Sequence, residues 1–598
     1  ALLQTIGERS GGNPFFAQEI VRDLAERGVL RGNRGAYLSS ADAVEVSVPA
    51  TLQATISARI DRLDPHAKRT LSAAAVIGSR FSQDLLETLG IHPVLEDLVR
   101  GEFIDQIRFT RQAEYVFHHA LIRAVAYESL LKADRAELHR RVANAVESRD
   151  PAAADQNAAL IAEHVEAAGD LHAAYGWHMR AATWATNRDV AAAQLSWERA
   201  RKIADALPAD DANRAAMRIA PRTMLCGIAW RVHAHVAGAV FDELRELCAA
   251  AGDKASLAIA MAGPVVDHTY QGRIREASRL ASEAMALIES LGDPTLTLGL
   301  SFAPIYAKLQ SAEFPDVLRW SERVIDLADG DPSKGNFLLG SPLAVALAHR
   351  AVARYCLGRA GWREDMQRGL ALARNADPLS YATVVSFVYF PGISFGVVTP
   401  DDAAVREIEN ARQIAERAGD DLALAAIEVT LGAALMNRQS ASERERGQRL
   451  LVEVREAFER GGYGLGDLPI VDVYLARERA GRGDRDEAIP VIRAAVDHLV
   501  RERQLLGWGV PATGALVETL LDRGADGDVI EAEAVIDRLA RLPADRVIEH
   551  DIWLLRLQAL LAQAHGNVTA YTHLRDRYRD MARTLGFQGH IVWSEALP

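Results

Sequence analysis

Two short stretches near the start of the chain carry residue types that can bind a phosphorylated ligand. In SGGNPFFAQEI (residues 10–20), two glycines, an asparagine and a proline lead directly into an amphipathic helix. In FHHALIRAVAYESLL (residues 117–131), His118 and His119 stand where a predicted strand meets a helix start. A helix N-terminus attracts anions, and a histidine there can donate a hydrogen bond to a phosphate. The same residues also have a simpler interpretation, as a helix cap and a packing histidine.

The first stretch already satisfies the rules of helix initiation. Asn13 is a strong N-cap, and Pro14 suits the first helical position because its missing N–H would have had no partner there. Gly28 predicts the end of this helix. Capping does not explain the position of Gly12-Asn13-Pro14, which follows a helical segment at once and precedes the segment that carries His119.

Other motifs point away from catalysis within this chain. No G-x-x-x-x-G-K-[ST] phosphate loop is present, and GGYGLGD (residues 461–467) fails the G-x-G-x-x-G pattern at its last position. GISFG (residues 392–396) matches G-x-S-x-G with Ser394 as nominal nucleophile, after a stretch, ATVVSFVYF, that could be a strand. A nucleophile elbow needs a helix directly after the serine and a surrounding sheet. A helix-end packing site is the better interpretation, and no catalytic residue is predicted.

Composition narrows the class of protein. The chain has 598 residues and a net charge of −13, with 19 basic and 20 acidic residues in the first 150, so direct nucleic-acid binding is not expected. Its three cysteines are widely spaced, which predicts neither a disulfide framework nor a zinc site and fits the cytoplasm. No metal site is predicted from the scattered histidines. No apolar run is long enough to cross a membrane.

Helix and strand patterns predict a mainly α protein with two kinds of domain. Residues 46–150 show several helices and one β-hairpin, in DQIRFTRQAEYVFHH, which is a winged-helix pattern. From about residue 155 the chain is nearly all helical, and turns marked by aspartate recur with a period near 40. Such a period predicts an α-solenoid of tetratricopeptide (TPR) type. These turn aspartates are Asp170, Asp253, Asp293, Asp331, Asp377 and Asp420.

Together these segments resemble the STAND proteins, the signal-transduction ATPases with numerous domains. Gly12-Asn13-Pro14 resembles the Gly-x-Pro motif that closes their nucleotide-binding domain. VPATLQATISARIDRLDPHAKRTLSAAAVIGSRF and YVFHHALIRAVAYESLLKADRAELHRRVA resemble the start and the end of their winged-helix domain. The resemblance implies three parts: the end of a helical lid (1–45), a winged-helix domain (46–150) and a TPR-like sensor (151–598).

The same resemblance implies a nucleotide site that is incomplete in this chain. Pro14, with Gly12 and Asn13, would lie near the adenine of ATP or ADP, and His119 would contact the β-phosphate. His119 aligns with the histidine of a Met-His-Asp motif whose other two positions are His118 and Ala120 here. The phosphate loop and the Walker B acid would belong to an upstream domain. The 598-residue chain alone is therefore not expected to hydrolyse ATP.

The function implied is regulatory. The repeats would bind a protein or a small ligand, and the winged helix would transmit that event to the upstream ATPase, with a nucleotide-dependent oligomer as one outcome. The C-terminal sequence YRDMARTLGFQGHIVWSEALP lacks a LuxR-type DNA-binding module and resembles STAND proteins that carry an N-terminal adenylate or guanylate cyclase. The alternative is a transcriptional regulator that binds DNA through its winged helix or a further module.

Overall fold

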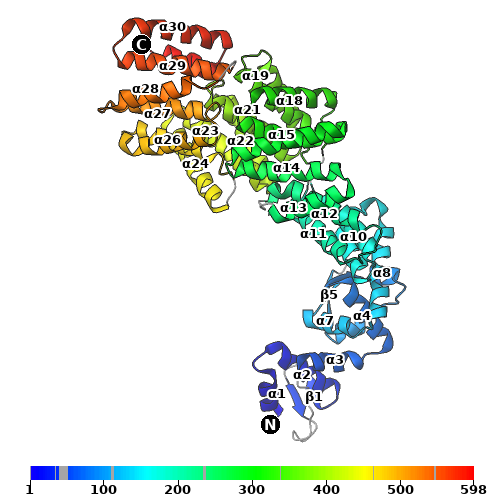
Figure 1. Cartoon of the computed structure of the whole chain (residues 1–598). Helices are drawn as coiled ribbons and strands as arrows, with labels where there is room; N and C mark the ends of the chain where they lie inside the picture. Colours follow the sequence, from blue (N-terminus) through cyan, green and yellow to red (C-terminus); the bar gives the residue numbers. More distant parts are fainter. Residues whose placement is uncertain are drawn as a thin grey trace. The chain divides into compact units, whose positions relative to one another are not determined.

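The computed structural model describes residues 2–33, 36–39, 51–108, 113–186, 188–232, 238–336, 338–461, 464–543 and 547–597. It is mainly α-helical, as the sequence predicts (Figure 1). Contacts between residues divide the chain into two compact units. The first comprises residues 1–185 and 195–209, and the second comprises residues 186–194 and 210–598. The predicted boundary at residue 45 falls outside the described residues.

The first unit combines helices with two small sheets. Its elements are α1 (Leu2–Ser10), α2 (Pro14–Glu26), β1 (Leu30–Asn33), β2 (Ala36–Ser39), α3 (Leu52–Asp61), α4 (Pro65–Ile77), β3 (Arg80–Ser82), α5 (Gln83–Thr88), α6 (Leu95–Arg100), β4 (Ile104–Arg108), β5 (Glu114–Phe117), α7 (Ala120–Glu128), α8 (Lys132–Arg149), η1 (Pro151–Ala153), α9 (Ala158–Ala167) and α10 (Leu171–Ala185). The helix starts follow local chemistry. Asp64 accepts from the N–H of His66 at 2.8 Å, and Ser82 accepts from the N–H of Leu85 at 3.3 Å, so both residues act as N-caps, a role for which aspartate and serine are well suited.

The predicted hairpin forms part of a three-stranded antiparallel sheet. The strand order is β3-β5-β4, with Phe81 opposite Tyr115 and Ile104 opposite Phe117. A bulge between Gln106 and Arg108 shifts the register at the end of the hairpin where the chain passes from β4 to β5. Along the chain, the elements follow the order helix, strand, helix, helix, strand, strand from α4 to β5. β1 and β2 form a separate antiparallel pair.

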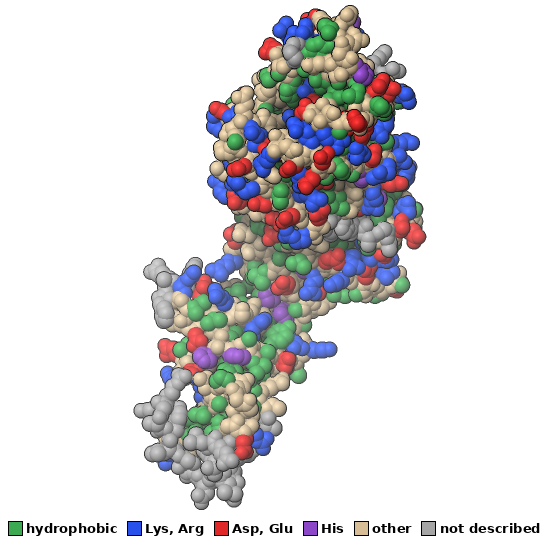
Figure 2. Space-filling model, turned by 90° about the vertical axis from the view of Figure 1, so that its left-hand side faces the viewer, with side chains coloured by type: hydrophobic (Ala, Val, Ile, Leu, Met, Phe, Trp, Pro, Cys, Tyr) green, Lys and Arg blue, Asp and Glu red, His purple; other side chains and the backbone are tan. Residues whose placement is uncertain are grey.

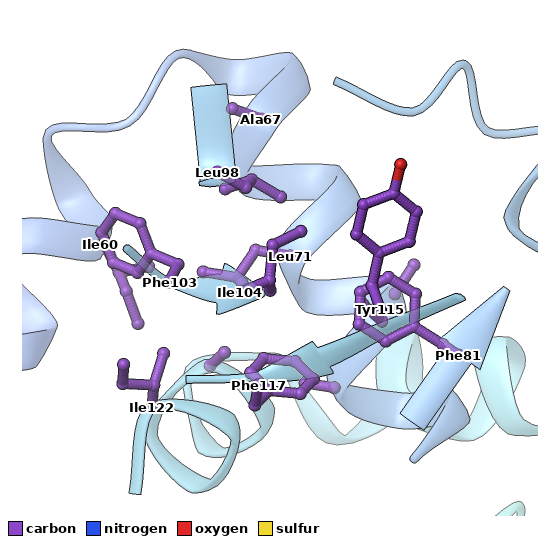
Figure 3. Packing of buried hydrophobic residues seen from close by; sticks show 14 of the residues in the cluster. Ile60, Ala67, Leu71, Phe81, Leu98, Phe103, Ile104, Tyr115, Phe117 and Ile122 are labelled. Carbon is purple, nitrogen blue, oxygen red and sulfur yellow. The ribbon is translucent and has the colours of Figure 1, made fainter. Parts of the chain in front are cut away.

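One apolar core joins this sheet to the helices around it (Figure 3). Period-2 alternation sends Phe81, Tyr115 and Phe117 to the same side of the sheet, where they pack on buried residues of α4, α6 and α7. Leu71 and Leu98 are fully buried within this core. The core fixes the C-terminal end of β5, and this end is where His118 and His119 begin the next helix.

The second unit contains only helical elements among its described residues. They are η2 (Ala229–Val232), α12 (Arg214–Ile228), α13 (Gly238–Ala251), α14 (Lys254–Tyr270), α15 (Ile274–Leu291), α16 (Pro294–Leu300), α17 (Phe302–Gln310), α18 (Phe314–Ala328), α19 (Pro342–Cys356), α20 (Trp362–Ala373), α21 (Pro378–Ser394), α22 (Asp402–Ala418), α23 (Asp421–Met436), α24 (Ala441–Gly461), α25 (Leu468–Gly481), α26 (Arg485–Arg501), α27 (Gly509–Arg523), α28 (Asp528–Ala540), α29 (Ile548–Ala564), α30 (Val568–Leu585) and α31 (Gln588–Glu595). Helix α11 (Val190–Ala206) contributes residues to both units.

The aspartate-marked turns explain how these helices begin. Asp253, Asp293, Asp377 and Asp420 are the N-caps of α14, α16, α21 and α23, and each carboxylate accepts from a backbone N–H of its helix. Short turns bring consecutive helices into contact, as between α14 and α15, α23 and α24, and α25 and α26. Small residues permit these contacts: α15 buries three alanines, and Gly432 of α23 meets Gly447 of α24.

The surface in view carries mixed charge. In Figure 2, basic and acidic side chains are interspersed over the helices in the upper part of the view, with no broad field of one sign among the described residues of that face. No helix among the described residues is long and apolar enough to cross a membrane.

Candidate functional site

The turn before α2 has the geometry that its sequence predicts. Asn13 caps the helix, and its side-chain oxygen accepts from the N–H groups of Phe15 at 3.0 Å and Phe16 at 3.2 Å. Pro14 is the first residue of α2. Gly12 has φ +83° and open space where a Cβ would stand, so the backbone conformation rather than crowding favours glycine here. Gly12, Asn13 and Pro14 are all exposed.

His119 lies beside this turn, although more than 100 residues separate the two in sequence. The imidazole of His119 stacks on the ring of Phe15, with centroids 3.8 Å apart and planes inclined by 14°. Phe15 directly follows Pro14, so the stack brings together the two segments singled out from the sequence. All four predicted contact residues therefore belong to one neighbourhood on the surface of the first unit.

The hydrogen bonding of His119 fixes what its ring can offer a ligand. His119 is the N-cap of α7, and its Nδ1 accepts from the N–H of Leu121 at 3.1 Å. Because Nδ1 accepts, the proton of the neutral ring resides on Nε2. No described residue accepts a hydrogen bond from Nε2, and the side chain is exposed. The ring thus presents an N–H donor beside the turn at Gly12 and Pro14.

His118 has a different environment from His119. Its Nδ1 lies 2.8 Å from a carboxylate oxygen of Asp105 in β4, so this ring holds the end of the hairpin to the helix start. The two adjacent histidines therefore differ: one is paired with an acid of its own sheet, and the other stacks on α2.

An ion-pair network fastens α2 to α3. The acids Glu19, Asp23 and Glu26 lie on one face of α2, because their spacing of four and three residues matches the helical repeat. The bases Arg59 and Arg62 face them from α3. The Arg59 guanidinium binds Glu19 at 2.5 Å and Glu26 at 2.9 Å, while Arg62 binds Asp23 at 2.6 Å.

Arg59 extends this network into the core of the first unit. Its side chain is fully buried, as is that of Glu19. A third bond joins Arg59 Nη2 to the carbonyl of Gly101 at 2.6 Å, and the guanidinium lies 4.5 Å from the ring centroid of Phe103. Arg22 adds a bond to Glu19 and an ion pair with Glu102. A displacement of α2 would therefore disturb the contacts at the C-terminal end of α6, next to the three-stranded sheet.

The prediction that residues 382–390, ahead of Ser394, could form a strand is wrong. Residues 382–390 belong to α21, which ends at Ser394. β-branched and aromatic residues favour strands only weakly, and burial among neighbouring helices outweighs that preference here. The Ser394 hydroxyl is buried and lies 2.9 Å from the hydroxyl of Tyr474, so the interpretation as a helix-end packing site is confirmed.

The second unit contains an apolar cavity that the sequence analysis did not predict. About 1070 Å³ of space, part of it continuous with the surrounding solvent, lies between α14, α17, α21, α23 and the segments that precede α25 and α27. Its walls are dominated by aromatic rings, several of which contact one another. An apolar, ring-lined cavity with a few polar groups is typical of small-molecule sites.

One corner of this cavity is polar. Gln310 accepts from the indole N–H of Trp508 at 2.6 Å and donates toward the hydroxyl of Tyr306 at 3.3 Å and the carboxylate of Asp467 at 3.4 Å. Burial raises the pKa of the Asp467 carboxyl to about 6, an effect that the bond from Gln310 partly opposes. Burial also raises the pKa of Tyr270 and that of Tyr306, so both phenols stay protonated at neutral pH.

One side of this corner is formed by part of the glycine-rich break at residues 461–467, which fails the nucleotide-loop pattern. Gly464, Gly466 and Asp467 come from that break. A Cβ at Gly466 would stand 2.7 Å from the carbonyl of Thr269, so glycine is needed for the backbone to approach α14. An isolated aspartate after several glycines was the available clue, but the aromatic partners come from helices up to 237 residues away in sequence. No cluster of three or more potential metal ligands occurs within the described part of the chain.

Comparison with the sequences of known proteins finds similarity over only part of the chain. No family model matches the chain. An uncharacterised protein of Rhizobium meliloti (strain 1021) is 31% identical over 170 residues, which cover 27% of this chain and 16% of that protein. The match thus spans about a sixth of the curated relative's length.

Two solved structures show distant likeness. One is a STAND protein with a tetratricopeptide repeat sensor from Pyrococcus horikoshii, 13% identical, with a TM-score of 0.44 over 84% of this chain and 69% of that chain. The other is a circular tandem repeat protein with a novel repeat topology, 13% identical, with a TM-score of 0.15 over 88% of this chain and 98% of that chain. At these scores neither likeness defines the fold.

Proposed function

We propose that this chain is the regulatory and sensor part of an ATP-dependent signalling protein of the STAND type. The helical second unit senses a ligand, and the first unit couples that event to a nucleotide held by an upstream ATPase domain. The observation that carries the proposal is the stack of His119 on Phe15. It brings the two segments that resemble nucleotide-contacting motifs into one exposed neighbourhood and leaves a free N–H donor there.

The arrangement of the first unit supports a coupling role. The order of elements from α4 to β5 and the β3-β5-β4 sheet are those of a winged helix, and we propose this identity for the segment. Its ion pairs to α2 tie the proposed lid segment to the winged helix through buried charges. Removal of one partner from a buried ion pair is costly, so the two segments are expected to move together.

Nucleotide retention in the longer protein tests this proposal. In the product that includes the residues encoded before Ala1, His119→Asn keeps a good N-cap but removes the ring and its Nε2 donor. A hydrogen bond to a charged group contributes about 1.5–3 kcal/mol, so ADP release should become about tenfold to hundredfold faster. His118→Asn is the matched control and should leave ADP release nearly unchanged, since this ring pairs with Asp105.

Two results would contradict the proposal. One is equal ADP release from the His119→Asn and His118→Asn proteins. The other is sustained ATP hydrolysis by the 598-residue chain alone, which would require catalytic groups that we do not assign. The expected output domain, a nucleotide cyclase, is tested separately by measuring cyclic nucleotide formed by the longer protein.

DNA binding through the winged helix is disfavoured by its own residues. In this arrangement α6 would enter the major groove, as the second helix of a helix-turn-helix does. Its exposed positions include Glu96 and Asp97, and Arg100 already binds Asp97 at 2.9 Å. Such a face repels phosphates, whereas DNA-binding surfaces are basic.

A further inference from the structure

We propose that the aromatic cavity of the second unit binds a small organic cation: a protonated amine or quaternary ammonium group joined to an apolar body. This inference names the chemical class of the sensor's ligand. It rests on the proposed function only for the consequence of binding, because the site itself is defined by residues of this chain.

The walls of the cavity are suited to a cation. Faces and edges of Trp230, Tyr270, Phe302, Tyr306, Phe387 and Trp508 contribute to them. These rings hold one another in place, with Tyr306 in contact with Phe302 at 5.8 Å and Phe387 at 5.6 Å between centroids. Aromatic faces attract cations through their quadrupoles, and a cage of several rings is the usual way that proteins recognise quaternary ammonium groups.

Asp467 supplies the matching negative charge. Among the described residues that line the cavity, it is the one charged side chain. Asp467 precedes α25, where an aspartate would ordinarily cap the helix, yet its side chain makes no capping bond. The carboxylate instead turns toward Gln310, and no described residue donates to its Oδ2. Its position is thus explained by a ligand better than by the helix.

Other ligand classes fit these groups less well. An anion would face both the carboxylate of Asp467 and the electron-rich ring faces. A neutral hydrocarbon would leave a carboxylate in a mainly apolar cavity without a counter-charge, which is unfavourable. A cation with an apolar body satisfies the carboxylate and the rings together. A mainly apolar lining with a few polar groups is also what small-molecule sites commonly have.

An isosteric pair of probes tests the charge requirement. Benzyltrimethylammonium and neopentylbenzene have nearly the same shape and differ in charge. Binding to the 598-residue chain is followed at pH 8, where Asp467 is ionised, by calorimetry and by tryptophan fluorescence. We expect benzyltrimethylammonium to bind at least tenfold more tightly than neopentylbenzene. Asp467→Asn should weaken binding of the cation at least tenfold and leave that of neopentylbenzene within twofold.

The controls separate this inference from the proposed function. Asp331→Asn removes a carboxylate from an exposed turn outside the cavity and should not alter binding. Trp508→Leu, which removes an aromatic wall without changing charge, should also weaken binding of the cation. Equal affinity for the two probes, absence of binding by both, or retention of cation binding in Asp467→Asn would overturn the inference. None of these measurements depends on ATP, so a failure of nucleotide coupling leaves them interpretable.

Discussion

Replacement of Arg59 should loosen α2 from the rest of the first unit. Arg59→Leu removes three hydrogen bonds, to Glu19, Glu26 and the carbonyl of Gly101, and leaves the Glu19 carboxylate buried. Loss of one partner from a buried pair costs about 3–5 kcal/mol. Arg22 still binds Glu19 at 2.6 Å, so we expect a value near the lower end, about 3 kcal/mol.

A double-mutant cycle distinguishes this mechanism from a simple loss of packing. If the cost comes from stranding Glu19, then removing Glu19 as well should recover part of it. The double variant Arg59→Leu with Glu19→Leu should be less destabilised than Arg59→Leu alone, with a coupling energy of about 2 kcal/mol. Glu26 is one-third exposed and can be solvated in both variants.

Hydrogen exchange of the intact chain is the appropriate assay, because it reports the opening of α2 separately from the helical second unit. Backbone amides of α2 should lose protection in Arg59→Leu and regain part of it in the double variant. Arg108→Leu is the matched control, since Arg108 pairs with Glu114 on the surface and such pairs contribute about 0–1 kcal/mol. A coupling energy near zero, or an Arg59→Leu effect as small as that of Arg108→Leu, would refute the reasoning.

Two further predictions concern the second unit. His349 is fully buried, neither ring nitrogen has a partner among the described residues, and burial lowers its pKa from 6.5 to about 3. The folded state therefore resists a protonation that the unfolded state accepts. The contribution of His349 to the free energy of unfolding is fully present above about pH 6.5 and is lost as the pH falls toward 3, with a loss of about 2 kcal/mol at pH 5. His349→Leu should remove this loss. The denaturation midpoint should therefore fall less between pH 7.5 and pH 5 in the variant than in the unaltered chain, and an equal fall in both would contradict the prediction. Gly447→Ala places a Cβ 2.9 Å from the carbonyl oxygen of Gly432, so the variant should lose about 1–3 kcal/mol in denaturant unfolding, whereas Gly481→Ala, with open space around it, should be neutral or stabilising by up to about 1 kcal/mol.

Local chemistry explains which features could be predicted from the sequence. Caps such as Asn13, Asp64 and Ser82 depend on neighbours two or three residues away, so the sequence contains the whole argument. The hairpin was predictable for the same reason, since alternation and a turn lie within one short stretch. The helical periodicity likewise predicted a mainly α chain. The helix over residues 382–390 was not predictable from its β-branched residues, because burial between neighbouring helices decides its conformation.

The two candidate sites differ in the same way, because one depends partly on local sequence and the other on tertiary packing. His119 could be singled out because a histidine at a helix start has recognised chemistry, but its contact with Phe15 depends on tertiary packing. The cavity could not be predicted at all. Gln310, Asp467 and Trp508 are separated by 157 and 41 residues in sequence, and each alone resembles an ordinary polar or core residue. The close approach at Gly466 brings the glycine-rich break against α14, and a sequence offers no measure of such distances.

The choice of histidine at position 119 bears on its role. Asn, Asp and Ser are better N-caps, and any of them would serve α7 if capping were the sole requirement. Histidine caps through Nδ1 and keeps a ring that stacks on Phe15 and an N–H that remains free. The capping bond also selects the tautomer in which Nε2 is the donor. The interpretation of His119 as a helix cap is therefore compatible with its interpretation as a phosphate contact. A cap that orients an unused donor beside Gly12 and Pro14 is what a phosphate contact from a neighbouring domain would require.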